Sequence, residues 1–346
     1  MLRPLGAELE HEFRIPRGEG MQVTLTAARK GLRPATARPD ISPDAAGYPV
    51  AKELVHRSKL PDVLPVAWRT LTENRYLITV DWPQDHPFYT GEAGKGAATL
   101  LAETIRQCGL LLAHAAYEVP LGHHFIMWDM EYSGPCPAAQ AGEPRRMEVE
   151  AVCSDLRHRG RLLGGMTCRM TLRRDGVVVG EGGGRFDIIS PAAYRRLRGD
   201  RLQTEAPPVQ PDPVPPGRVG RARPMDVLLA PAPQPASEAG GIAGRWQLRA
   251  DFGHPTLFDH RNDHFPGMVL LEAALQAANA TVAPAVYHHT SAKVCFLGYV
   301  EYDAPCWIES RTRPADAAQP PAIEITAHQN GRLVFAALLD GTAVPA

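Results

Sequence analysis

The residues best suited to chemistry lie in one stretch near the middle of the second half of the chain. A turn that contains His260 and His264 leads through a Pro-Gly pair into an apolar segment with Glu272 and Gln276. Pro-Gly delivers a chain to a helix start, where the amide of Gly267 and its neighbours are unpaired and face the positive end of the helix dipole. An imidazole and a carboxylate at such a helix start can polarise a thioester carbonyl and move a proton. The alternative is a capped core helix with two polar residues at its edge.

A second segment, from about residue 97 to residue 117, has the same design. It is nearly all apolar, and Glu103 and Gln107 are four residues apart, which puts both on one face of a helix. A helix that is apolar on most faces is a buried helix. A carboxylate there is costly unless it is paired or functional, so we expect Glu103 to be functional. Gln107 and Gln276 are expected to form hydrogen bonds at their helices rather than to react.

The two segments belong to a longer repeat. Val55-His-Arg, followed by Asp62-Val-Leu, recurs as Val219-Gly-Arg followed by Asp226-Val-Leu, and a His-Pro pair precedes each Glu by 17 and 18 residues. Strand-like stretches with hairpin turns follow each helix. The chain is therefore expected to be a tandem duplication of one α+β unit. We expect an N-terminal arm over 1–50, a first unit over 51–196, a Pro-rich linker over 197–244 that holds the start of the second repeat near 219–230, and a second unit over 245–346.

Composition excludes several classes of protein. A formal net charge of −1 argues against a nucleic-acid binder. No apolar run reaches the roughly 18 residues of a membrane span, and the N-terminus lacks a signal-peptide core. The six cysteines show no paired spacing, as expected of free thiols in a reducing cytosol. We expect a cytoplasmic protein without a metal, because Pro-Gly breaks the stretch in which His260 and His264 would pair as helical ligands.

Longer motifs add a resemblance to a known family. Val55-His56-Arg57, Leu101–Gln107, Pro120–His123, Met127–Asp129 and Phe258–Ala273 strongly resemble the AfsA family of bacterial γ-butyrolactone and butenolide/furan signal biosynthesis, over roughly residues 50–340. The resemblance implies a tandem, or double, hotdog fold, each unit a long buried helix wrapped by an antiparallel sheet. It implies an acyltransferase that moves a β-ketoacyl group from acyl carrier protein to the hydroxyl of dihydroxyacetone phosphate, after which the ester condenses to a butenolide. No cofactor is implied beyond the carrier's phosphopantetheine. The chain is expected to act as a monomeric pseudo-dimer or as a homodimer, without nucleic-acid or membrane partners.

A more distant resemblance to β-hydroxyacyl-ACP dehydratases implies how the two repeats cooperate. His260 falls at the dehydratase His and Glu272 at its Glu, whereas the first repeat keeps Glu103 but has Glu92 where the His would be. Dehydratase sites are shared across a dimer. The site that combines His260 with Glu103 is therefore expected to be complete, and the one that combines Glu92 with Glu272 to be degenerate.

The implied reaction assigns the remaining roles. Acyl transfer to an alcohol needs a base, donors for the oxyanion and a cation for the phosphate. We expect Glu103 or His260 as the base, and Gly267 with neighbouring amides around the thioester oxygen. Arg106, Arg261 or Lys95 are expected to meet the phosphate. We expect His264 to be a second catalytic residue and His86 to contact the substrate. The alternative is that both are structural residues of turns. No Ser or Cys nucleophile signature appears, so direct transfer without an acyl-enzyme is expected.

Two other functions fit the same residues. An acyl-ACP dehydratase or thioesterase of hotdog type would use the same His and Glu without an acceptor alcohol. A non-catalytic acyl-binding module would hold the ligand without turnover. Dependence on dihydroxyacetone phosphate separates the transferase from both.

Overall fold

The computed structural model describes residues 47–90, 97–134, 146–207, 209–233, 241–315 and 321–345. Three sequence expectations lie outside these ranges, namely most of the N-terminal arm, Glu92 and Lys95.

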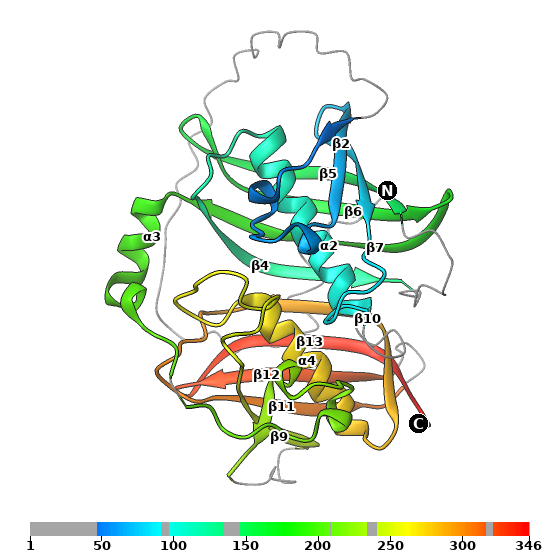
Figure 1. Cartoon of the computed structure of the whole chain (residues 1–346), viewed down its shortest axis with the longest axis vertical. Helices are drawn as coiled ribbons and strands as arrows, with labels where there is room; N and C mark the ends of the chain where they lie inside the picture. The colour runs from blue at the N-terminus through cyan, green and yellow to red at the C-terminus, as the bar shows by residue number, and fades with distance from the viewer. Residues whose placement is uncertain are drawn as a thin grey trace. The chain divides into compact units, whose positions relative to one another are not determined.

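The first half of the described chain wraps an antiparallel sheet around one helix (Figure 1). Helix α2 (Ala97–Leu111) ends in a π-helical turn (Leu112–Ala116), and nearly all of its residues are buried because it is apolar on most faces. The sheet order is β1-β2-β3-β5-β6-β7-β4. Its strands are β1 (Tyr48–Pro49), β2 (Pro65–Thr72), β3 (Arg75–Asp81), β4 (His124–Ser133), β5 (Arg146–Arg159), β6 (Leu162–Arg174) and β7 (Val177–Ile189).

The second half repeats this arrangement around helix α4 (Gly267–Val282). Its sheet order is β10-β13-β12-β11-β9-β8. The strands are β8 (Leu229–Pro231), β9 (Gly244–Leu248), β10 (Val286–Phe296), β11 (Cys306–Arg313), β12 (Ala322–Gln329) and β13 (Arg332–Val344). The predicted α+β class and the double hotdog arrangement are confirmed.

The two halves share one sheet. Strand β4 pairs antiparallel with β10, from Ser133 opposite Ser291 to Asp129 opposite Cys295, which produces a continuous sheet of 13 strands. Helices α2 and α4 contact each other on the same side of this sheet (Figure 1). Loops that leave one helix therefore reach the neighbourhood of the other.

Much of the stretch expected to be a linker packs against these halves. Helix α3 (Pro191–Arg198) begins at Ser190, whose hydroxyl accepts a hydrogen bond from the amide of Ala193. Farther along, the buried Val214 and Val219 and the buried run 227–230 join the core. Two short helical turns there, Pro216–Val219 and Pro224–Asp226, match Lys52–Val55 and Leu60–Asp62 of the first half. Among the described residues no helix is both long and apolar enough to cross a bilayer.

Candidate active site

Each half holds a buried cluster of one Arg, one Glu and one Gln. In the first half Arg57 donates to Glu103 Oε1 from Nε (3.0 Å) and Nη2 (2.6 Å). Gln107 Nε2 donates to Glu103 (2.6 Å) and to the carbonyl of Asp62 (2.7 Å), and its Oε1 accepts from the amide of Leu64 (2.9 Å). The Gln thus ties the helix to the segment that carries the Arg.

The second half has the same cluster. Arg221 contacts Glu272 at 2.8 and 2.6 Å, and Gln276 Nε2 donates to Glu272 (2.8 Å) and to the carbonyl of Asp226 (2.7 Å). The amide of Leu228 donates to Gln276 Oε1 (2.8 Å). As expected, both Gln residues form hydrogen bonds at their helices.

Each Arg also crosses to the other half. Arg57 Nη1 donates to the carbonyl of Thr256 (2.8 Å), and Arg221 Nη1 donates to the carbonyl of Phe88 (2.9 Å). The loop that contains Phe88 is held by His86, whose Nε2 lies 2.7 Å from Asp62 Oδ1 and whose Nδ1 accepts from two amides. His254 does the same with Asp226 in the second half. These paired clusters are the frame that joins the halves. The buried ring of His86 holds a turn and does not line the cavity, which favours the structural alternative over the expected substrate contact.

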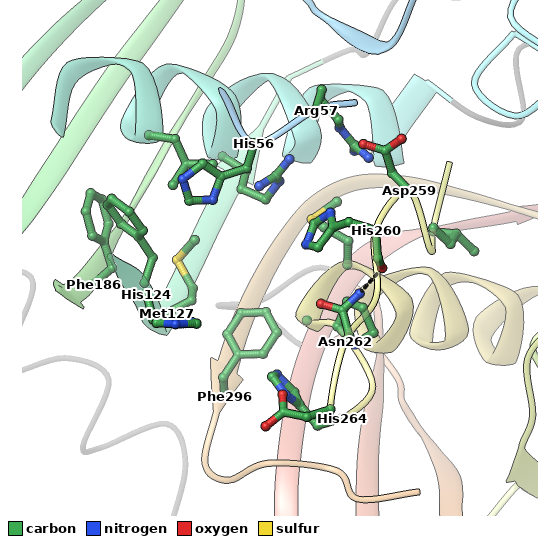
Figure 2. A pocket seen from close by; sticks show the side chains of 18 of the residues that line it. His56, Arg57, His124, Met127, Phe186, Asp259, His260, Asn262, His264 and Phe296 are labelled. Atoms are coloured by element: carbon green, nitrogen blue, oxygen red, sulfur yellow. Dashed lines mark hydrogen bonds and ion pairs between the residues drawn. The ribbon is translucent and has the colours of Figure 1, made fainter. Parts of the chain in front are cut away.

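A cavity of about 480 Å³ opens beside the first-half cluster and the loop of the second half that leads into α4 (Figure 2). Its polar lining is dominated by five imidazoles and three guanidiniums, those of His56, His123, His124, His260, His264, Arg57, Arg106 and Arg261. Asp259 also lines it, but the backbone amide and hydroxyl of Ser58 donate to its carboxylate. The apolar lining includes Phe125, Met127, Phe186, Met268 and Phe296. The cavity is suited to a molecule with an anionic group and an apolar chain.

Arg106 distinguishes this cluster from its counterpart. It donates to Glu103 Oε2 from Nε (2.8 Å) and to Oε1 from Nη2 (2.7 Å), and it lines the cavity. The position that corresponds to it in α4, one residue before the Gln, is Leu275. Only the first-half cluster therefore offers a second guanidinium for a substrate anion.

Glu103 is placed to position these guanidiniums. It is completely buried, and its oxygens accept from Arg57, Arg106 and Gln107. Burial alone would raise the pKa of Glu103, but the two guanidiniums outweigh it and lower the pKa to about 2. These bonds favour an imidazole over Glu103 as the base, and a role of Glu103 as the base stays a prediction.

Glu272 has no access to the cavity either. Its carboxylate accepts from Arg221, Gln276 and the hydroxyl of Thr99 (2.6 Å), and it does not line the cavity. Its acceptor positions are taken by buried donors, and the catalytic role expected for Glu272 stays a prediction.

The imidazoles of the second-half loop do reach the cavity. His260 lies at its exposed side, and desolvation together with Arg106 lowers its pKa, so the ring is neutral at pH 7. His264 Nδ1 lies 2.7 Å from Asp263 Oδ1, and Asp263 also accepts from Tyr194 (2.7 Å) and Arg198 (2.7 Å). His264 is thus oriented by a carboxylate that α3 holds in place.

The remaining expected contacts are close to these imidazoles. Arg261 is largely exposed and lies 3.8 Å from Glu205. Gly267 begins α4 and lines the cavity, and a Cβ atom there would come within 2.9 Å of the Phe296 ring. The cavity therefore reaches the start of α4, where the Pro-Gly pair is expected to leave amides for a carbonyl oxygen. No group of three or more metal-ligating side chains occurs among the residues that the structure describes.

One pair of residues was missed by the sequence reasoning. His56 Nε2 lies 2.9 Å from His114 Nε2, although the two are 58 residues apart in the chain. The available signal was the change from His56 in the first Val-x-Arg motif to Gly220 in the second.

Comparison with known proteins identifies the family of the chain. The model of the AfsA family, described as the A-factor biosynthesis hotdog domain, matches residues 40–190 and 202–345. The chain belongs to the AfsA family. A relative from Streptomyces virginiae, named 2-oxo-3-(phosphooxy)propyl 3-oxoalkanoate synthase, is 40% identical over 84% of this chain and 96% of its own length.

A second relative and a solved structure also match the chain. A Streptomyces coelicolor relative of the same name is 38% identical to this AfsA-family chain over 87% of the chain and 94% of its own length. Among solved structures, the putative oleoyl thioesterase of Lactobacillus plantarum covers 80% of the chain and 100% of its own, at 12% identity and a TM-score of 0.47.

Proposed function

We propose that this AfsA-family chain transfers a 3-oxoacyl group from a carrier-bound thioester to the hydroxyl of dihydroxyacetone phosphate. The observation that carries the proposal is the cavity itself, which Arg106 and Arg261 line together with His260 and His264 of the loop that leads into α4. The name shared by the Streptomyces relatives describes a phosphorylated ester of this kind. The product belongs to the synthesis of a γ-butyrolactone, butenolide or furan signalling molecule.

The cavity supplies each requirement of the reaction. Arg106 and Arg261 bind the phosphate, because guanidiniums form charge-assisted hydrogen bonds with phosphate oxygens. The amide of Gly267 and its neighbours at the start of α4 stabilise the oxyanion that forms on the thioester carbon. The apolar wall that includes Met268 and Phe296 receives the acyl chain.

The chemistry is one substitution at the acyl carbon. The hydroxyl oxygen forms a bond to that carbon, the carbon–sulfur bond breaks, and the hydroxyl proton leaves through a base and ends on the sulfur. With Glu103 bound to guanidiniums, an imidazole is the base. The donor is an acyl carrier protein, whose phosphopantetheine arm enters on the exposed side, where His260 lies. The chain works in the cytoplasm as a monomer in which two halves imitate a dimer.

The test is to follow acyl loss from a 3-oxoacyl carrier protein by intact mass, with and without dihydroxyacetone phosphate. We expect unloading that requires the triose phosphate and yields a product with the mass of the phosphorylated ester. Hydrolysis without the triose phosphate would replace the proposal with a thioesterase, and loss of water from a 3-hydroxyacyl carrier would indicate a dehydratase. Binding without any turnover would leave an acyl-binding module.

A further inference from the structure

The two halves differ in a small group of residues on one wall of the cavity. Both share the Arg, Glu and Gln of the buried clusters, so these residues serve the frame. Arg106 and His56 of the first half are replaced by Leu275 and Gly220 in the second. Helix α4 contains no histidine that would correspond to His114. The residues that both halves share thus serve the fold, and the residues that the second half replaces serve the cavity.

The hydrogen bonds of His56 and His114 fix the position of every ring proton. His114 Nδ1 lies 2.7 Å from the carbonyl oxygen of Val119, which accepts only, so this nitrogen carries the proton. Burial lowers the pKa of His114, so its ring is neutral and Nε2 is an acceptor. His56 Nε2, 2.9 Å away, must then be the donor. This leaves His56 Nδ1 with a free lone pair, and among the described residues it has no hydrogen-bond partner.

His56 occupies this place at a backbone cost. Its φ is 54°, in the left-handed region that few residues other than Gly adopt, although His, Asn and Asp do so more often than the rest, and the corresponding Gly220 has φ 70°. The turn therefore needs a residue in this conformation but does not need an imidazole. A strained residue that the fold does not require indicates a functional role.

We propose that His56 is the catalytic base of the acyl transfer and that His114 is a positioning residue that fixes the His56 tautomer. The assignment rests on the proposed function. The hydroxyl of the triose phosphate gives its proton to His56 Nδ1 as its oxygen bonds to the acyl carbon. His56 then returns the proton to the sulfur as the carbon–sulfur bond breaks, which restores the neutral ring. His114 Nε2 accepts the Nε2 proton of His56 throughout and stabilises the transient cation.

The other imidazoles are less well prepared for this step. No hydrogen bond fixes the His260 ring among the residues that the structure describes, and His260 lies on the exposed side. The Nδ1 atom of His264 is already hydrogen-bonded to Asp263. In Figure 2 His264 lies below Phe296, whereas His56 lies directly under helix α2. His56 lines the same cavity as Arg106, which is proposed to hold the phosphate. Desolvation and then Arg106 lower the pKa of His56 to about 3. A phosphate dianion bound to Arg106 opposes the effect of Arg106 on His56. The pKa of His56 therefore rises when the phosphorylated acceptor is bound, and His56 becomes a stronger base.

The experiment compares the wild type with His56→Gly and His114→Asn in the intact-mass assay under single-turnover conditions. Glycine is the residue that the second half carries at this turn, so His56→Gly is expected to fold. We expect a loss of about 100- to 10,000-fold in the rate of transfer for His56→Gly, with the half-saturating concentration of the triose phosphate changed less than about threefold. Added imidazole is expected to restore part of the His56→Gly rate. It should not restore an Arg106→Leu variant, which serves as the matched control. His114→Asn keeps a donor for Val119 but offers His56 no acceptor, and an intermediate loss of about 10- to 100-fold is expected.

A His56→Gly rate within about threefold of the wild type, or a larger loss in His260→Ala than in His56→Gly, would overturn the assignment. A wild type that does not need the triose phosphate refutes the proposed function instead. A second measurement is independent of turnover. Nitrogen-15 shifts of the histidine rings should show His56 protonated at Nε2 and His114 at Nδ1 at pH 7, and in His114→Asn the His56 signals should move toward tautomer exchange. The opposite tautomers would exclude His56 Nδ1 as a proton acceptor.

Discussion

Replacing Arg106 with Leu tests the phosphate site most directly. The second half already accommodates this change, because Leu275 occupies the corresponding helix position and is buried beside an intact Arg221–Glu272 pair. In the variant, Glu103 keeps its bonds from Arg57 and Gln107. We therefore expect a folded protein. The change removes one cavity cation whose side chain is 21% exposed and whose guanidinium is already oriented by Glu103.

The expected effect follows from the kind of bond that is lost. A hydrogen bond to a charged group contributes about 1.5–3 kcal/mol, and each 1.36 kcal/mol is a factor of ten in rate. The value of kcat/KM with dihydroxyacetone phosphate should therefore fall roughly 10- to 150-fold. The decisive comparison uses unphosphorylated dihydroxyacetone as the acceptor. With that acceptor the wild type and Arg106→Leu should differ by less than about threefold, because no phosphate contact remains to be lost. An equal fall with both acceptors would refute the reasoning, since it would show that Arg106 acts on the frame or on the base and not on the phosphate.

Three further outcomes are expected. Glu103→Gln and Glu272→Gln each leave buried guanidiniums without a carboxylate. Each should lower the free energy of unfolding by about 3–5 kcal/mol in urea titrations. The Glu272→Gln variant should nevertheless keep its activity per folded molecule. Because the pKa of Glu103 is lowered from 4.5 to about 2 in the folded protein, its contribution to stability is complete above pH 4.5 and is lost as the pH falls toward 2, which the wild type but not Glu103→Gln should show in acid unfolding. Gly267→Ala keeps the backbone amide but places a Cβ within 2.9 Å of the Phe296 ring, so the helix start or the ring must shift. This variant should lower kcat/KM roughly tenfold, because a displaced oxyanion donor loses part of its effect.

The sequence was sufficient for the features that depend on local pattern. The four-residue spacing of Glu103 and Gln107 in an apolar segment indicated a buried helix, and its recurrence at Glu272 and Gln276 indicated the duplication. These inferences succeed because helical periodicity is visible in any window of the chain.

The chemistry of the carboxylates was not predictable in the same way. A buried Glu suggests either a reactive group or an ion pair, and the choice depends on partners that are distant in sequence. Arg57 lies 46 residues before Glu103, and the cross-half contact of Arg57 with Thr256 spans 199 residues. The pairing of His56 with His114 is equally nonlocal, so single-sequence reasoning had no means to join them.

The sheet shared through β4 and β10 has a consequence for stoichiometry. In a homodimer of single units every substitution appears twice, so the two sites are always identical. In this chain the halves are encoded separately, and one half could gain Arg106 and His56 while the other kept Leu275 and Gly220. Each polypeptide should therefore bind one phosphorylated acceptor and carry one acyl group per cycle, and a calorimetric titration should reach saturation at one equivalent per chain.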